Sequence, residues 1–212
     1  MPSFACQTCG AAFEVTDKTL AKYPGWKPRY CHTHSPKKKV PVGGHIARLA
    51  SEGALSPAQV LALYPDPGQD GLFTDGSCHP NPGPGGWGVV WVKGGAVVGE
   101  RHGAEGATTN NRMELRALIE ALAMLPEDSS EVVHSDSNLC VQSVNTWCKS
   151  WAARGWKRKE GPIANLDLVQ RLYGLAQARP GVQIRWIRAH AGHRWNEYAD
   201  SLANTWRRGA PD

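Results

Sequence analysis

Residues 71–101 read GLFTDGSCHPNPGPGGWGVVWVKGGAVVGER, and this stretch decides the fold class. Leu72–Asp75 is predicted as a short strand that runs into a turn-rich segment, with Trp87–Val92 and Ala96–Arg101 as two further strands. The Gly-Gly pair between the last two strands is a hairpin signal. Three neighbouring strands, two of them joined by a hairpin, are therefore expected to begin a sheet.

Beyond Arg101, helix and strand patterns alternate, which is typical of an α/β domain. Apolar residues recur at helical spacing from Asn110 to Leu125. Further helices are predicted after Ser135 through the Trp147–Trp156 stretch, over Leu166–Ala178 and over Trp195–Trp206, and further strands over Glu131–Ser135 and Val182–Ala189.

The composition is that of an ordinary folded protein of 212 residues, with 41% hydrophobic and 20% charged residues. A net charge of +5 fits a polyanionic partner without identifying one. No signal-peptide-like run and no run of about eighteen apolar residues is present. We therefore expect a cytoplasmic protein without a membrane partner, whose six cysteines are metal ligands or plain thiols rather than disulfides.

Four acidic residues lie where a surface position alone does not explain them. Asp75 and Asp136 each end an apolar strand, Glu114 falls in the first turn of a helix, and Asp200 lies inside a helix. Strand ends of one sheet converge at one edge, where acids on covering helices can join them. Taken singly, each acid has an ordinary alternative, because Asp136 could cap the following helix and Asp200 could be solvated.

Four clustered carboxylates could not all stay ionised without cations. Hard oxygen ligands suit Mg²⁺ or Mn²⁺, which retain waters and bind phosphate oxygens. Two such ions about 4 Å apart can activate a water and stabilise a leaving oxygen in phosphoryl transfer. Spacing alone supports only an α/β domain with a candidate metal site.

Four sequence motifs surround these acids in a recognisable order. They are TDGSCHPNPGPGGWG (74–88), TTNNRMEL (108–115), HSDS (134–137) and RAHAGHRWNEYADSLAN (188–204). In order and spacing they resemble type 1 ribonuclease H, over about two-thirds of the chain. The resemblance implies a mixed five-stranded sheet, three strands antiparallel and two parallel, flanked by helices, and an endonuclease that cuts the RNA strand of RNA–DNA hybrids.

The resemblance also implies roles for the acids. Asp75 would bridge two Mg²⁺ ions, replaceable by Mn²⁺, while Asp200 would help hold the ion near the attacking water and Glu114 and Asp136 would complete the other site. His190 corresponds to the family's mobile loop histidine, which would assist proton movement or product release. Its alternative is a loop histidine without chemistry. His193 is expected to be structural.

Substrate contacts follow from the same resemblance. Asn110, Asn111 and Asn138 match positions that meet bases and sugars in the minor groove, and the backbone at Gly76 and Cys78 would approach the RNA. The phosphate pocket for the DNA strand would include Asn81 and Thr109. Helix capping is the ordinary alternative for the Asn110-Asn111 pair.

The tryptophan-rich stretch NTWCKSWAARGWKRKE (145–160) matches the family's basic protrusion, which grips the DNA strand. Trp147 would lie against a deoxyribose, with Arg154, Trp156 and Lys157 beside it, whereas Trp151 is better explained by packing. Many bacterial relatives carry lysines where this chain has Ala152 and Ala153, so the grip of this element is expected to be weaker. Catalysis is not put in doubt.

The N-terminal residues contain two knuckles with zinc-ribbon spacing: Cys6-x2-Cys9, then Cys31-x2-His34. Thiolates and an imidazole at this spacing can close a tetrahedron around a structural Zn²⁺. His32 is a rival for the fourth ligand, and unliganded thiols in a tail are the alternative. The ribbon could bind nucleic acid, a protein partner or only its metal. Cys140 and Cys148 are interpreted as helix packing residues.

The sequence thus predicts four segments: a zinc-ribbon-like module (1–36), a linker with short helices (37–70), a catalytic domain (71–208) and a tail (209–212). Within the linker, HIARLA (45–50) and SPAQVLALY (56–64) have helical patterns, the second capped by Ser56. The protein is expected to be a monomer. Two alternatives to the nuclease are a hybrid-binding module without catalysis and an integrase- or transposase-like nuclease of the same fold.

Overall fold

The computed structural model describes residues 2–6, 10–17, 21, 27–29, 55–189 and 191–208. The chain divides into two compact units, Met1–Arg48 and Leu49–Asp212, each of which is described by itself. No helix in the described ranges is long and apolar enough to cross a membrane.

A five-stranded mixed sheet organises the second unit. Its strands lie in the order β5-β4-β3-β6-β7. The first three pair antiparallel, whereas β6 pairs parallel with β3 and β7 parallel with β6. This confirms the expected sheet. The strands are β3 (Gly71–Cys78), β4 (Gly83–Lys93), β5 (Ala96–Thr108), β6 (Val132–Ser135) and β7 (Gln183–Trp186).

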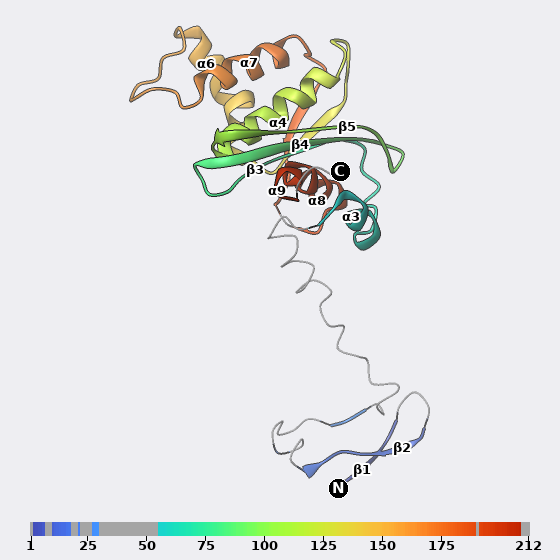
Figure 1. Cartoon of the computed structure of the whole chain (residues 1–212). Coiled ribbons are helices and arrows are strands. Elements are labelled where there is room, and N and C mark those ends of the chain that lie inside the picture. Colours follow the sequence, from blue (N-terminus) through green and yellow to red (C-terminus); the bar gives the residue numbers. More distant parts are fainter. Residues whose placement is uncertain are drawn as a thin grey trace. The chain divides into compact units, whose positions relative to one another are not determined.

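Helices cover both faces of this sheet (Figure 1). Successive side chains of a strand point to opposite faces, so Leu72 joins the core beneath α4 while Phe73 contacts His193 at the start of α8. One face carries α4 (Asn110–Met124), α6 (Cys148–Ala153) and α7 (Leu166–Gln177), and the other carries α3 (Pro57–Leu63), α8 (Arg194–Ala203) and α9 (Thr205–Arg208).

The glycine-rich strands are longer than the sequence predicted. β3 continues beyond Asp75 to Cys78, because Gly76, Ser77 and Cys78 pair with β4 rather than forming the predicted turn. β5 likewise continues to Thr108, since its partner β4 begins at Gly83. The last strand is shorter than predicted and ends at Trp186.

Two predicted helices are interrupted. The helical stretch after Ser135 consists of α5 (Asn138–Gln142), a π-helical segment η1 (Ser143–Trp147) and α6, which follow one another without a break. The closing helix divides into α8 and α9 at Asn204, whose side-chain amide donates to the backbone carbonyl of Asp200 at 3.0 Å. Such side-chain bonds to the preceding turn compete with regular helix.

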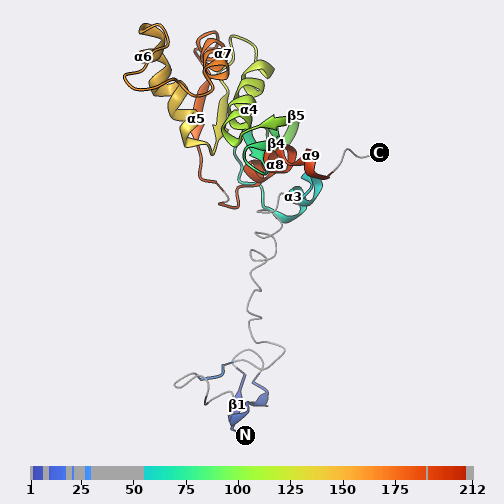
Figure 2. The same ribbon diagram turned by 60° about the vertical axis from the view of Figure 1, so that its left-hand side comes forward.

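The predicted helix at residues 56–64 is confirmed as α3. The Ser56 hydroxyl accepts from the Gln59 amide and the Gln59 side chain accepts from Ser56, which forms a capping box. α3 packs on α8 with Val60 completely buried, and Arg208 donates to the Leu55 carbonyl at 2.8 Å. Part of the predicted linker therefore belongs to the second unit, where it packs on α8 (Figure 2). The helix predicted at 45–50 lies outside the described residues.

The first unit contains a small antiparallel pair, β1 (Ser3–Ala5) and β2 (Ala12–Glu14). The rings of Phe4 and Phe13 lie opposite each other, with centroids 6.1 Å apart. Cys6 follows β1 and is buried, and its carbonyl accepts from the Gly10 amide at 2.8 Å. Cys9, Cys31, His32 and His34 lie outside the described residues, so the zinc module stays a prediction.

Candidate active site

The parallel pairing of β3 with β6 brings Asp75 and Asp136 together. Thr74 of β3 stands opposite Ser135 of β6, and each aspartate is the next residue along its strand direction. Asp75 accepts a hydrogen bond from the Gly76 amide at 2.9 Å. The tryptophan Trp186 of β7 donates its indole N–H to the Asp136 carbonyl at 3.0 Å. Pairing of β3, β6 and β7 therefore fixes the backbone of both acids.

Glu114 reaches the same point from α4, because the helix lies unusually close to β3. A Cβ atom at Gly76 would come within 2.2 Å of the Glu114 backbone nitrogen. Only glycine permits this approach without displacing the helix. The first turn of α4 begins at Thr109, whose hydroxyl accepts from the Arg112 amide at 3.4 Å. Cap and glycine together place the Glu114 carboxylate beside Asp75 of β3.

Asp200 comes from α8, on the other face of the sheet. A Cβ at Gly88 of β4 would meet the Ala199 carbonyl oxygen at 2.4 Å, so this helix is also closely packed. Tyr198 donates to Glu100 of β5 at 2.7 Å, which ties the helix to a second strand. Asp200 lies within hydrogen-bonding reach of Asp75. The fourth predicted acid therefore joins the cluster.

The cluster is compact and carries competing negative charges. One oxygen from each of Asp75, Glu114 and Asp136 lies within 4.8 Å of the others. Burial raises the pKa of Asp75 well above its usual range, and the charges of Glu114, Asp136 and Asp200 raise it further. Burial, together with Asp136 and Asp200, raises the pKa of Glu114 in the same way. The carboxylates thus cannot all ionise without a neutralising cation.

The donor set fits a hard divalent cation. All four side chains offer oxygen ligands, which Mg²⁺ and Mn²⁺ prefer over softer donors. Glu114 Oε2 is buried and has no hydrogen-bond partner within the described ranges, which leaves it available as a ligand. A buried carboxylate oxygen without a partner is costly unless a cation approaches it.

Two asparagines that sequence reasoning missed support the acids from α8. Asn196 donates its side-chain amide to Asp136 Oδ2 at 3.1 Å, and Asn204 donates to Asp200 Oδ1 at 2.8 Å. Ser77 of β3 in turn donates to Asn204 Oδ1 at 2.6 Å. Asn196, Asp200 and Asn204 are spaced four residues apart and so share one helix face. In the sequence, this spacing is the signal that could have identified the two asparagines as partners of the acids.

The predicted contacts for the DNA phosphate surround the start of α4. Asn81 Oδ1 accepts from the Asn110 backbone amide at 3.2 Å. Thr109, not Asn110, is the N-cap of the helix, so the capping alternative for Asn110 is wrong. Asn111 is exposed beside it. Cys78 is buried, and its thiol donates to backbone carbonyls including that of Pro80 at 3.2 Å, so the loop that carries Asn81 is anchored to β3.

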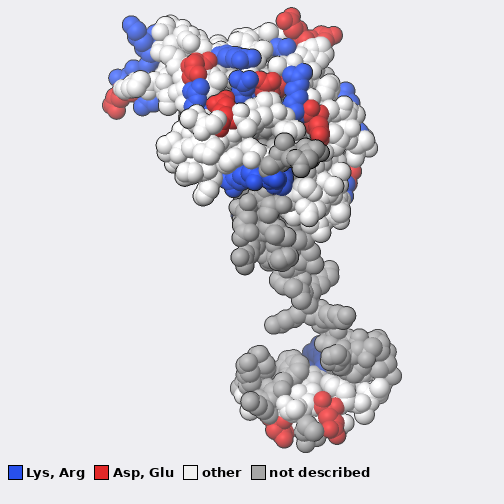
Figure 3. Space-filling model, viewed as in Figure 1, with Lys and Arg blue, Asp and Glu red and all other residues white. Residues whose placement is uncertain are grey.

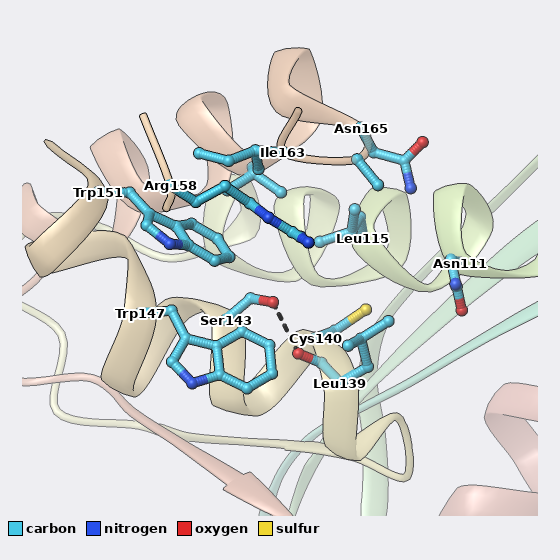
Figure 4. A pocket seen from close by; sticks show the side chains of 12 residues that line it. Asn111, Leu115, Leu139, Cys140, Ser143, Trp147, Trp151, Arg158, Ile163 and Asn165 are labelled. Atoms are coloured by element: carbon cyan, nitrogen blue, oxygen red, sulfur yellow. Dashed lines mark hydrogen bonds between the residues drawn. The ribbon is translucent and has the colours of Figure 1, made fainter. Parts of the chain in front are cut away.

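A cavity of about 130 Å³ brings Asn111 and Trp147 into one lining (Figure 4). The side chain of Arg158 extends across it from Trp151 toward Leu115. Trp147 is 37% exposed and lies beside Trp151, with ring centroids 5.7 Å apart. Trp151 packs against the core, as the sequence favoured. The cavity therefore joins the start of α4 to the tryptophan-rich segment.

The remaining predicted contacts lie in the segment after α6 and at the start of α5. Arg154, Lys157, Arg158 and Lys159 are exposed, and basic side chains gather at that end of the molecule with an acidic one among them (Figure 3). Trp156 instead packs edge-on against Tyr173, with ring centroids 5.8 Å apart. Asn138 is exposed at the first residue of α5.

His190 lies outside the described residues, so its role stays a prediction. The predicted packing role of Cys140 and Cys148 is confirmed, since each side chain is only 1% exposed. Burial raises the pKa of Cys140 to about 12 and that of Cys148 to about 11, which keeps both thiols protonated.

Comparison with known proteins places this geometry in a family. The family model described as RNase H matches residues 68–207, about two-thirds of the chain. The chain belongs to the ribonuclease H family. It is 49% identical over 139 residues to a ribonuclease H of Methylorubrum extorquens and 48% identical over 138 residues to one of Herminiimonas arsenicoxydans.

The two ribonucleases H differ in how much of them is matched. The alignment spans 66% of this chain and 60% of the Methylorubrum protein, but 63% of this chain and 90% of the Herminiimonas protein. Among solved structures, LC9-RNase H1, described as a type 1 RNase H with the type 2 active-site motif, is 40% identical with a TM-score of 0.52. That match covers 63% of this chain and 69% of that one. The family match therefore covers the second unit and not the first.

Proposed function

We propose that the ribonuclease H domain hydrolyses the RNA strand of RNA–DNA hybrids and leaves 5′-phosphate and 3′-hydroxyl ends. The observation that carries this proposal is the convergence of Asp75, Glu114 and Asp136 within 4.8 Å. Asp200 adjoins them, and all four belong to the stretch that the family model matches. The cytoplasmic location and the monomeric state stay predictions.

The carboxylates would hold two Mg²⁺ ions, with Mn²⁺ as a substitute. When bound, these cations supply charge neutralisation at the scissile phosphate and a more acidic water. The chain's own residues do the positioning. Asn196 would keep Asp136 oriented through its bond to Oδ2, and Asn204 would do the same for Asp200 through its bond to Oδ1. His190 is assigned to proton movement or product release.

We assign discrimination between the RNA and DNA strands to three groups of residues. Gly76, Cys78, Asn110, Asn111 and Asn138 would meet the minor groove, where ribose hydroxyls mark the RNA strand. A DNA phosphate would occupy the site beside the Asn81 and Thr109 side chains. On the protrusion, Trp147, Arg154, Trp156 and Lys157 would grip the DNA strand, with Trp147 against a deoxyribose. The exposed Trp147 supports this role, whereas the packing of Trp156 on Tyr173 makes its contribution indirect.

The test of the proposed function is cleavage of one end-labelled RNA in three forms: single-stranded, RNA–RNA duplex and RNA–DNA hybrid. We expect cutting of the hybrid only, dependent on Mg²⁺ or Mn²⁺ and abolished by EDTA. Tight hybrid binding without cutting would instead identify a non-catalytic binding module. Cutting of DNA strands would favour an integrase- or transposase-like nuclease of the same fold.

For the N-terminal unit we propose a zinc-ribbon-like module that strengthens hybrid binding. The proposed ligands of the structural Zn²⁺ are Cys6, Cys9, Cys31 and His34. The buried Cys6 at the turn after β1 supports this set, because thiolate ligands in small ribbons are shielded from solvent. Lys37-Lys38-Lys39 would add contacts to the phosphate backbone.

Deletion of residues 1–54 should raise the Michaelis constant for a hybrid and flatten its dependence on salt. Each lost phosphate contact reduces the slope of log affinity against log salt by about 0.9. The deletion ends before Leu55 because the following helix, α3, packs on α8 of the ribonuclease H domain. Steady-state kinetics at several salt concentrations measure the effect, with Lys37, Lys38 and Lys39 replaced by alanine as the comparison. Unchanged kinetics at every salt concentration would overturn the role in hybrid binding and would favour a module that binds another partner.

A further inference from the structure

Gln69 forms a bridge between two histidines of the ribonuclease H domain, one in β6 and the other at the start of α8. Its side-chain nitrogen lies 3.1 Å from His134 Nε2, and its side-chain oxygen lies 2.8 Å from His193 Nε2. An amide nitrogen only donates and an amide oxygen only accepts. His134 Nε2 must therefore carry no proton, whereas His193 Nε2 must carry one. The bridge fixes the tautomers of both rings.

Phe73 reinforces this bridge from within the sheet. Its ring stacks on His134 with centroids 4.6 Å apart and contacts His193 with centroids 5.0 Å apart. Both histidine rings are thus held by an aromatic contact on one side and by the Gln69 amide at their Nε2 atoms. Neither ring can turn without losing both contacts.

His193 leads directly to the catalytic acids. Its carbonyl accepts from the backbone amides of Asn196 and Glu197, both at 3.0 Å, and so forms the first turn of α8. From that turn the Asn196 side chain reaches Asp136, and one turn later Asp200 reaches Asp75. A displacement of His193 would shift supports of two carboxylates at once.

The segment before β3 holds the same helix end. Arg194, the residue after His193, donates to the Tyr64 carbonyl at 2.5 Å, and Val60 of α3 is buried against α8. The residues that hold the start of α8 therefore include the chain immediately N-terminal to the sheet. Within this segment, the Gln69 side chain contacts both His134 of β6 and His193 at the start of α8.

We propose that Gln69 is a positioning residue for the metal-binding carboxylates, acting through His193 and the first turn of α8. This inference rests on the proposed nuclease function. It assigns no contact with substrate to Gln69. It also gives His193 a defined role, as the link between the segment before β3 and the helix that carries Asp200.

The test compares Gln69→Leu, which keeps the shape but loses the amide, with Gln177→Leu at the exposed end of α7 as the matched control. Gln69→Leu should lower kcat about tenfold, the lower end of what removal of an outer partner of a metal ligand costs. The Michaelis constant for the hybrid should stay within about twofold of wild type, because the binding surfaces are elsewhere. The control should match wild type throughout.

Two readouts do not depend on cleavage. Calorimetry should show weaker Mg²⁺ binding by Gln69→Leu, and ¹⁵N spectra of the imidazoles should lose the fixed tautomers of His134 and His193. Val60→Ala loosens α3 without touching Gln69. For each variant we compare the loss of kcat with the loss of melting temperature. If Val60→Ala loses as much kcat for each degree of melting temperature as Gln69→Leu does, the role of Gln69 is merely structural and the proposal fails.

Two outcomes separate this proposal from the proposed function. A wild-type protein that cuts no hybrid overturns the function, whereas a fully active Gln69→Leu with normal Mg²⁺ binding overturns only the positioning role. Should Gln69→Leu fail to fold, Gln69→Glu takes its place. A carboxylate still accepts from His193 but cannot donate to His134, so this variant should keep more of kcat than His193→Ala does, and a loss equal to that of His193→Ala would contradict the proposal.

Discussion

Asp75→Asn should lower kcat for hybrid cleavage on the order of 10³-fold, the scale seen when one preorganised electrostatic group is removed from an active site. Asparagine keeps the size of the side chain but cannot supply the negative charge that a divalent cation requires. Burial raises the pKa of Asp75, and the charges of the three other acids raise it further. The measurement is the single-turnover rate on an end-labelled hybrid, with the exposed Asp128→Asn as the matched control.

The same substitution should stabilise the metal-free protein at high pH. Because the pKa of Asp75 is raised in the folded state, the folded chain binds a proton that the unfolded chain has already lost. The contribution of Asp75 to the stability of the metal-free wild type should therefore be greatest at low pH and be lost as pH rises through its pKa in the folded state. Melting curves in EDTA should show this fall in wild type and a smaller one in Asp75→Asn. Equal curves, or normal cleavage by the variant, would contradict the assignment.

Gly76→Ala should displace α4 and disrupt both stability and catalysis. The new Cβ would come within 2.2 Å of the Glu114 nitrogen and 2.4 Å of the Met113 carbonyl carbon, and backbone atoms inside a packed helix cannot move aside cheaply. Overpacking of this kind costs about 1–3 kcal/mol of unfolding free energy. A shift of about 1 Å in a catalytic group can cost about 100-fold in rate, so kcat should fall by at least that factor.

Gly106→Ala provides the control for this second substitution. Gly106 also lies in a glycine-rich strand, but a Cβ there would meet nothing within 4 Å. Urea unfolding and cleavage rates should therefore stay close to wild type, within about 0.5 kcal/mol for stability. If Gly76→Ala behaved like Gly106→Ala, the close approach of α4 to β3 would not be what positions Glu114.

Most of the sheet and the acid cluster could be predicted from sequence because periodicity and strand ends were informative. Apolar runs indicated β3 and β6, and the parallel register that pairs Thr74 with Ser135 makes the next residues, Asp75 and Asp136, neighbours, although β3 continues past Asp75. The resemblance supplied the division into three antiparallel and two parallel strands, which no local pattern contains, whereas the strand order came from the structure. The acids on α4 and α8 required knowledge of which helix covers which face.

The missed features have physical reasons. Gly76, Ser77 and Cys78 have the composition of a turn, yet they extend β3 because each of them pairs with a residue of β4. The end of α8 at Asn204 depends on a side-chain bond to Asp200 that helix propensity does not encode. Gln69 was assigned to a linker because it lies at the end of a stretch rich in proline, glycine and lysine. Its partners lie 65 and 124 residues away in the sequence.

The order in which the acids occur along the chain has a consequence for synthesis on the ribosome. Asp75, Glu114 and Asp136 emerge first, whereas Asp200 belongs to α8, whose packing closes the second face of the sheet. A nascent chain stalled before α8 would hold three acids without the helix that supplies Asn196 and Asp200. Under the proposed function, nuclease activity should therefore begin only after translation has passed α8, so that an incompletely folded domain would not cut hybrids.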